Sequence, residues 1–101
     1  MSSELSPADV LASYPPHAET IPALLASRAA VLPEKAALEF ESRIWSYGAL
    51  DEVSTLLACA AARRGVNKGD RIALVSVNTD LSVIVFLAAA KLGALFVPLN
   101  P

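Results

Sequence analysis

A chain of 101 residues holds at most one small domain, which can bury roughly 65% of its unfolded surface. The net charge of −2 and the scattered basic residues exclude the electrostatic footprint of a nucleic-acid-binding protein. The single cysteine, Cys59, cannot form an internal disulfide, which fits a reducing compartment. The residues after Met1 lack the basic start and long apolar core of a secretory signal peptide. We therefore expect a cytoplasmic protein.

The composition is unusually apolar. Hydrophobic residues make up 54% of the chain, and the mean hydropathy is +0.50. This fits either a membrane segment or a piece of a larger protein core. The membrane explanation depends on residues 81–97, which fall short of the ~20 residues that a span requires and contain Lys91. Because Gly93 and Pro98 also divide that run, we expect no membrane span.

The first half of the chain predicts a tail, a helix and a hairpin. Residues 1–19 show no sustained hydrophobic period and are expected to pack late or stay mobile. A short helix should begin near Thr20 and end before Pro33, with Ile21, Leu24 and Leu25 on one face. Two strands should follow at Ala36–Phe40 and Arg43–Ser46. The Glu41-Ser42 pair between them lacks the Asn-Gly or Asp-Gly that a two-residue turn prefers.

A longer helix is predicted at Tyr47–Arg64. Ser46 is a natural N-cap for it, and Gly65 should close it. Helical spacing assigns the buried face to Leu50, Val53, Leu57, Ala60 and Ala61. The opposite side should carry Asp51, Glu52, Thr55 and Arg63.

The last third predicts a βαβ unit, with strands at Arg71–Ser76 and Ala94–Pro98 and a helix at Asp80–Leu92 between them. The strands should be parallel and the crossover right-handed. Asn78 or Thr79 can cap the start of this helix, and the helix dipole favours the negative charge of Asp80 in its first turn. Gly93 should end the helix. This helix is apolar nearly all round and therefore needs cover on several sides, as in the inside of a larger α/β domain.

Few residues are candidates for chemistry. The Asn78-Thr79-Asp80 turn follows a strand, where open α/β sheets bind ligands, but Asp80 would repel a phosphate, which favours a helix cap. Lys91 could bind a phosphate of a ligand. Alternatively, it lies in the last turn of the predicted helix, where its positive charge interacts favourably with the helix dipole, and we prefer this structural role. A metal or base role for His17 and a reactive thiol at Cys59 are disfavoured, because neither has a suitable neighbour. Trp45 and Tyr47 are expected to pack rather than to stack on bases.

The blocks that carry a family resemblance lie in the last 37 residues. They are Gly65-Val66-Asn67-Lys68-Gly69-Asp70-Arg71-Ile72-Ala73, then Asn78, then Ala90-Lys91-Leu92-Gly93-Ala94, and finally Val97-Pro98-Leu99-Asn100-Pro101. From about Ile21 onward the chain resembles the N-terminal region of the acyl-adenylate-forming (AMP-binding synthetase/ligase) superfamily, and most of all the acyl-CoA synthetases. Ala49 departs from the glutamate frequent in that family, which removes half of a capping box.

The resemblance implies an α/β fold: an N-terminal fragment of the large adenylate-forming domain, with residues 20–101 as its incomplete first part. It implies a parent ligase that uses ATP, Mg²⁺ and coenzyme A to activate a fatty or aromatic carboxylic acid as acyl-AMP and pass it to the thiol. In the family the phosphate-binding loop lies downstream of the Pro-Leu-Asn-Pro block, so no catalytic, cofactor-binding or metal-binding residue maps onto this chain. We expect the fragment to be an inactive scaffold whose partner is the remainder of the ligase domain. The alternative is a stand-alone interaction module or remnant without catalysis.

Overall fold

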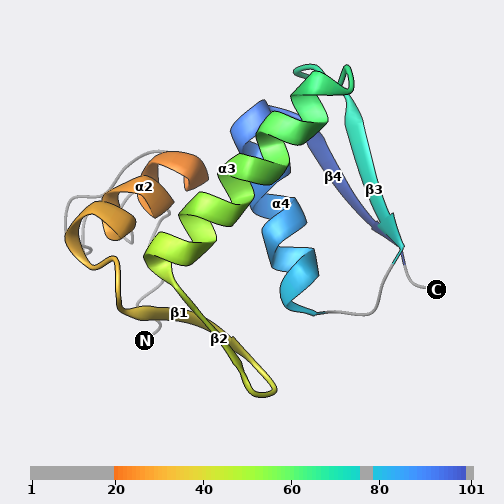
Figure 1. Cartoon of the computed structure of the whole chain (residues 1–101). Coiled ribbons are helices and arrows are strands. Elements are labelled where there is room, and N and C mark those ends of the chain that lie inside the picture. The colour runs from red at the N-terminus through yellow and green to blue at the C-terminus, as the bar shows by residue number, and fades with distance from the viewer. Residues whose placement is uncertain (1–19, 76–78, 100–101) are drawn as a thin grey trace, which may run out of the picture.

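The computed structural model describes residues 20–75 and 79–99, which form three helices and two two-stranded sheets (Figure 1). In chain order the elements are α2 (Ile21–Val31), β1 (Ala36–Phe40), β2 (Arg43–Ser46), α3 (Tyr47–Arg63), β3 (Arg71–Val75), α4 (Asp80–Leu92) and β4 (Leu95–Leu99). The predicted tail with its His17, and likewise Ser76 and Asn78, lie outside the described residues. The mixed α/β arrangement confirms the predicted fold class.

Helix α2 begins as the sequence predicts. The Thr20 hydroxyl accepts a hydrogen bond from the Ala23 N–H at 3.2 Å, which satisfies one of the free donors of the first turn. Leu25 is buried, whereas Ile21 and Leu24 on the same face remain 45% and 37% exposed. The apolar face of α2 is therefore only partly covered by the described residues.

The predicted hairpin is present with the predicted strand bounds. Strands β1 and β2 are antiparallel, and Phe40 pairs with Arg43 across a two-residue turn. Glu41 adopts a φ of 55°, in the left-handed region, so an ordinary residue supplies the positive φ for which such turns prefer asparagine or glycine. A register shift between Ala36 and Leu38 marks a bulge at the other end of the hairpin.

Helix α3 has the predicted cap, and its buried face agrees with the predicted one in part. The Ser46 hydroxyl accepts a hydrogen bond from the Ala49 N–H at 3.1 Å, and the helix ends at Arg63, one residue earlier than predicted. The buried residues are Leu50, Ser54 and Ala58, whereas Ala60 is exposed and Val53, Leu57 and Ala61 are half-buried. The prediction was right for Leu50, and Val53 and Leu57 pack against the core, but it wrongly included Ala60. It missed Ser54 and Ala58 because it followed large apolar residues.

Ser54 is the most deeply buried residue of α3, with no exposed surface. Its hydroxyl donates to the Leu50 carbonyl oxygen at 2.6 Å, so a polar residue is buried without an unsatisfied group. Small buried residues also lie on α4, at Ala88 and Ala89. In Figure 1, α3 crosses directly over α4, and these small side chains allow the two helices to pack closely.

The βαβ unit is confirmed. Strands β3 and β4 are parallel, with Arg71 opposite Leu95 and Val75 opposite Leu99. Helix α4 has the predicted bounds, and Gly93 ends it with a φ of 72°. Strand β4 lies one residue later than predicted. Within the described residues each of these strands pairs with one neighbour, so each leaves a free outer edge.

The core lies where the three helices meet. It is formed by Leu25 of α2, Leu50 of α3, and Ile84 and Leu87 of α4. Trp45 and Tyr47 pack against this core, as predicted.

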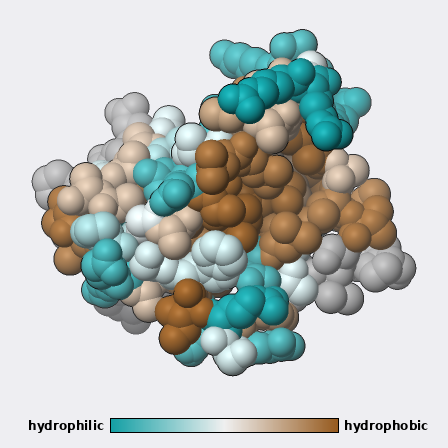
Figure 2. All heavy atoms as spheres, viewed as in Figure 1, coloured by the Kyte–Doolittle hydropathy of each residue, from teal (hydrophilic) through white to brown (hydrophobic). Residues whose placement is uncertain are grey.

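A second apolar region faces outward. Figure 2 shows hydrophobic side chains gathered over α3, α4 and the two parallel strands. The exposed residues on this part of the chain include Val75, Leu81, Phe86, Leu95 and Leu99. Their exposure agrees with the expectation that α4 needs more cover than the described elements provide. The described helices are all too short or too polar to cross a lipid bilayer.

Candidate functional site

The most elaborate polar cluster is built around Asp80, the first residue of α4. Arg43 of β2 donates from Nε to Oδ2 at 2.8 Å and from Nη2 to Oδ1 at 2.9 Å. The Trp45 indole Nε1 donates to Oδ2 at 2.9 Å, and the Leu81 N–H donates to Oδ1 at 3.1 Å. The hairpin is thereby fastened to the start of a helix 37 positions further along the chain.

Electrostatics keep this carboxylate charged. The hydrogen bonds from Arg43 and then from Trp45 hold the pKa of Asp80 well below its usual range, and the same contact raises the pKa of Arg43. Asp80 is only 6% exposed, whereas the Arg43 side chain is 54% exposed and also lies over the Phe40 ring at 5.2 Å. The cluster is thus a partly buried ion pair in which both carboxylate oxygens of Asp80 accept hydrogen bonds.

These contacts correct the predicted cap and agree with a structural role for the turn. Thr79 has the extended backbone of an N-cap, but its side chain makes no capping bond. Asp80 itself accepts from the Leu81 N–H. Because its two oxygens are used by Arg43, Trp45 and Leu81, the residue is a clamp between elements rather than part of a phosphate site.

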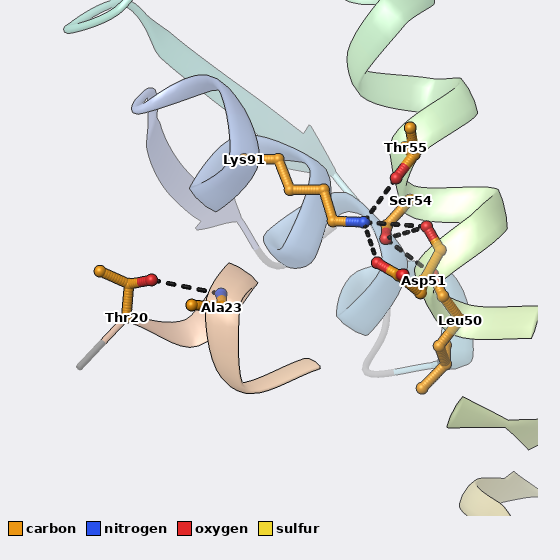
Figure 3. Close-up of polar contacts among 7 residues, drawn as sticks. All are labelled: Thr20, Ala23, Leu50, Asp51, Ser54, Thr55 and Lys91. Atoms are coloured by element: carbon orange, nitrogen blue, oxygen red, sulfur yellow. Dashed lines mark hydrogen bonds and ion pairs between the residues drawn. The ribbon is translucent and has the colours of Figure 1, made fainter. Parts of the chain in front are cut away.

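Lys91 lies at the other end of α4 and reaches across to α3 (Figure 3). Its Nζ donates to the Asp51 carboxylate at 2.6 Å, to the Asp51 carbonyl oxygen at 2.8 Å and to the Thr55 hydroxyl at 2.6 Å. The side chain is 14% exposed and all three ammonium protons have an acceptor. Lys91 lies in the last turn of α4, as predicted, but its ammonium group is bonded to α3, a contact that the sequence did not predict. Thr55 is exposed, as expected for its side of α3, whereas Asp51 is half-buried because Lys91 reaches across from α4 to its carboxylate and carbonyl oxygen.

The remaining candidates carry no chemistry in the described part of the chain. Cys59 is a free, exposed cysteine of α3. No three histidine, cysteine or acidic side chains among residues 20–75 and 79–99 are grouped so as to hold a metal ion. Asp80 and Asp51 are already committed to Arg43 and Lys91. The described residues therefore do not fit a Mg²⁺–ATP site.

An apolar groove of about 300 Å³ lies between α2, β1, α3 and α4. Leu25, Leu50 and Leu87 form its floor, and the half-exposed Ile21 and Leu24 form one wall. Arg28 is the charged residue among the described lining residues. Among the described lining residues, the polar side chains are the guanidinium of Arg28 and the phenol of Tyr47.

Comparison with known proteins gives the family. Residues 25–101 match the family model described as AMP-binding enzyme, which covers most of the chain. The chain belongs to the AMP-binding enzyme family. The resemblance seen in the sequence is thereby confirmed at the level of the adenylate-forming superfamily.

Relatives come from two branches of the AMP-binding enzymes. The chain is 32% identical over 78 residues to a nonribosomal peptide synthetase, benY, of Aspergillus terreus, covering 77% of this chain and 7% of the relative. It is 41% identical over 56 residues to an acyl-CoA ligase, sidI, of Beauveria bassiana, covering 55% of this chain and 10% of the relative. The chain thus spans a small fraction of the curated relatives that it matches.

Solved structures show the same arrangement of elements. The N-terminal subdomain of Klebsiella oxytoca NpsA superposes with a TM-score of 0.75 at 29% identity, covering 82% of this chain and 22% of that one. A Mycobacterium tuberculosis fatty acyl CoA synthetase gives 0.74 at 34% identity, covering 80% and 16%. The chain therefore corresponds to a part of the N-terminal subdomain of adenylate-forming enzymes.

The cluster of Arg43, Trp45 and Asp80 was not predicted from the sequence. Local patterns predicted the hairpin and α4 as separate units and related Asp80 only to the helix dipole. The available signal was an acidic residue opening an almost wholly apolar helix, because a buried carboxylate requires a cation or several donors. The sequence did not show which of the eight Lys and Arg residues would supply that cation.

Proposed function

We propose that this chain is the opening part of an ATP-dependent acyl ligase of the acyl-CoA synthetase branch. The parent enzyme would activate a carboxylic acid as acyl-AMP and transfer the acyl group to coenzyme A. The observation that carries the proposal is the family match over residues 25–101 together with the parallel βαβ unit. Similarity to an acyl-CoA ligase and to a fatty acyl CoA synthetase supports this branch.

Within that ligase the chain would act as scaffold. Its core joins three helices, and its polar clusters link elements to each other rather than to a ligand. The apolar surface over α4, β3 and β4 would be covered by the remainder of the domain. We therefore expect the 101 residues alone to fold weakly and to have no ligase activity. A sharp cooperative melt of the monomeric 101-residue chain would contradict the first expectation.

The first experiment is the intact mass of the natural gene product, followed by ATP–pyrophosphate exchange. A mass far above 10.6 kDa with exchange that depends on a carboxylic acid supports the ligase. Formation of a coenzyme A thioester would then support the acyl-CoA synthetase branch. Loading of an amino acid onto a carrier protein would instead assign the protein to the peptide synthetase branch, to which the Aspergillus terreus relative belongs.

The second candidate is a stand-alone interaction module. The free edges of β3 and β4 and the exposed Val75, Leu95 and Leu99 favour it, because such an edge can pair with a strand of another protein. A natural gene product of 10.6 kDa without exchange activity would support this candidate. Retention of a specific larger protein in a pull-down would identify the partner.

A further inference from the structure

The outer side of α3 carries a stripe of four exposed residues, Glu52, Leu56, Cys59 and Arg63. They are spaced by four, three and four positions, so they follow one line along the helix, with the spacing of a coiled-coil seam. This outer stripe runs opposite the buried stripe around Ser54, and in Figure 1 α3 lies in front of α4. The outer stripe is therefore turned away from the core of the described elements.

A hollow of about 300 Å³ lies beside the outer stripe, between α3 and strand β2. Its walls are apolar, from Trp45, Ala49, Val53 and Leu56, apart from the carboxylate of Glu52. Glu52 forms no ion pair within the described part of the chain. A side chain with an apolar stem and a cationic head fits this hollow, because the stem covers the apolar walls while the head meets the carboxylate.

Arg63, at the other end of the outer stripe, is a side chain of this kind. Its guanidinium likewise has no ion-pair partner among the residues that the structure describes. Eleven positions separate it from Glu52, which is roughly 16 Å along one helix, so the two side chains of one chain cannot meet. The opposite charges can pair only between two molecules.

The order of the outer stripe is self-complementary. Its spacing is the same from either end, with the midpoint between residues 57 and 58. When two copies of α3 pack antiparallel about a twofold axis at this midpoint, Glu52 of each copy lies opposite Arg63 of the other. Leu56 of each copy then lies opposite Cys59 of the other. The contact has an apolar centre, where Leu56 is 62% exposed in the single chain, and an ion pair at each end.

We propose that the outer side of α3 binds a second copy of this protein, with the Arg63 side chain of each copy in the hollow beside Glu52 of the other. A contact between two helices is small, so the dimer belongs to the weak, reversible class and forms as the protein concentration rises. Its exposed ion pairs weaken with added salt. This interface is independent of the proposed ligase activity.

Charge reversals test the proposal in the natural gene product. Glu52→Arg and Arg63→Glu each bring like charges together at both ends of the contact, so each variant alone should dimerise at least about tenfold more weakly than the wild type. A mixture of the two variants has opposite charges at both ends and should form a heterodimer about as tight as the wild-type dimer. Sedimentation velocity over a concentration series at low salt measures each association.

The matched controls are Glu34→Arg and Arg64→Glu, which change the same charges at exposed positions off the outer stripe. They should leave dimerisation unchanged. A wild type that stays monomeric at its highest soluble concentration would overturn the proposal. A dimer that both reversals leave intact would also overturn it, as would a mixture of the two variants that stays monomeric.

A cysteine pair tests the centre of the contact. Leu56→Cys is made in a Cys59→Ser chain and mixed with the unmodified protein, whose Cys59 should lie opposite the introduced thiol. The matched control carries Ala62→Cys instead, at an exposed position off the outer stripe. In a glutathione redox buffer, the disulfide to Cys59 of the second copy should form at least about tenfold faster than in the control, as measured by mass spectrometry of the linked peptides. Equal rates would overturn the proposal.

Discussion

Arg43 and Asp80 form a bidentate ion pair with N–O distances of 2.8 and 2.9 Å. It joins the first residue of β2, beside the hairpin turn, to the first residue of α4. The indole of Trp45 adds a third donor at 2.9 Å. Because the carboxylate is 6% exposed and the guanidinium is half-exposed, the acid carries most of the desolvation cost and depends on its partners. The pair fixes how the hairpin lies against α4.

Asp80→Asn should lower the melting temperature of the natural gene product by several degrees. The amide cannot accept the same charge-assisted bonds from Arg43 and leaves the guanidinium without its counter-charge. Glu39→Gln, on the same hairpin and exposed, is the matched control and should leave the melting temperature nearly unchanged. Equal melting temperatures of the Asp80 and Glu39 variants would show that the ion pair contributes nothing.

The ion pair also predicts a pH dependence. The pKa of Asp80 is lowered in the folded protein from its ordinary value of 3.8, so its contribution is fully present above that value. As the pH falls below it, the unfolded chain takes up a proton that the folded one does not, and the contribution is lost. The difference in urea midpoint between the wild type and Asp80→Asn should therefore be constant from about pH 7 to pH 5 and shrink below about pH 4. A difference that persists undiminished at about pH 3 would contradict the assignment.

Lys91→Met should reduce stability without a specific effect on ligase activity. The variant keeps the length of the side chain but removes the ammonium bonds to Asp51 and Thr55, at a cost of about 1–2 kcal/mol. Lys35→Met, exposed in the loop before β1, is the control. Urea unfolding gives the stability, and pyrophosphate exchange per folded molecule gives the activity. A large loss of activity at unchanged stability would instead indicate that Lys91 binds a phosphate.

Ala88→Leu should destabilise the protein by about 1–3 kcal/mol, because it inserts three carbons into a closely packed helix contact. Ala88 is 2% exposed on α4, three residues before Lys91, whose ammonium group contacts α3. Ala60→Leu is the matched control, since Ala60 lies on the exposed side of α3 despite its apolar character. Similar unfolding free energies for the two variants would mean that α3 and α4 are not packed as described.

The sequence by itself determined the elements and the family. The helix caps at Thr20 and Ser46 and the Gly93 that ends α4 act over a few residues, so the sequence shows them locally. The bounds of α4 and of both hairpin strands were predicted correctly for this reason. The spaced blocks from Gly65 to Pro101 were sufficient for the superfamily, and the family match confirms them.

Only the tertiary structure decided which faces meet and which charges pair. Ser54 is buried and Ala60 exposed because α4 crosses one stripe of α3, and no local period shows where a second helix will cross. The two ion pairs join residues that are far apart in the sequence: 37 positions separate Arg43 from Asp80, and 40 separate Asp51 from Lys91. Their partners are set by the packing of whole elements, since a charge selects a neighbour only after burial has brought the two together.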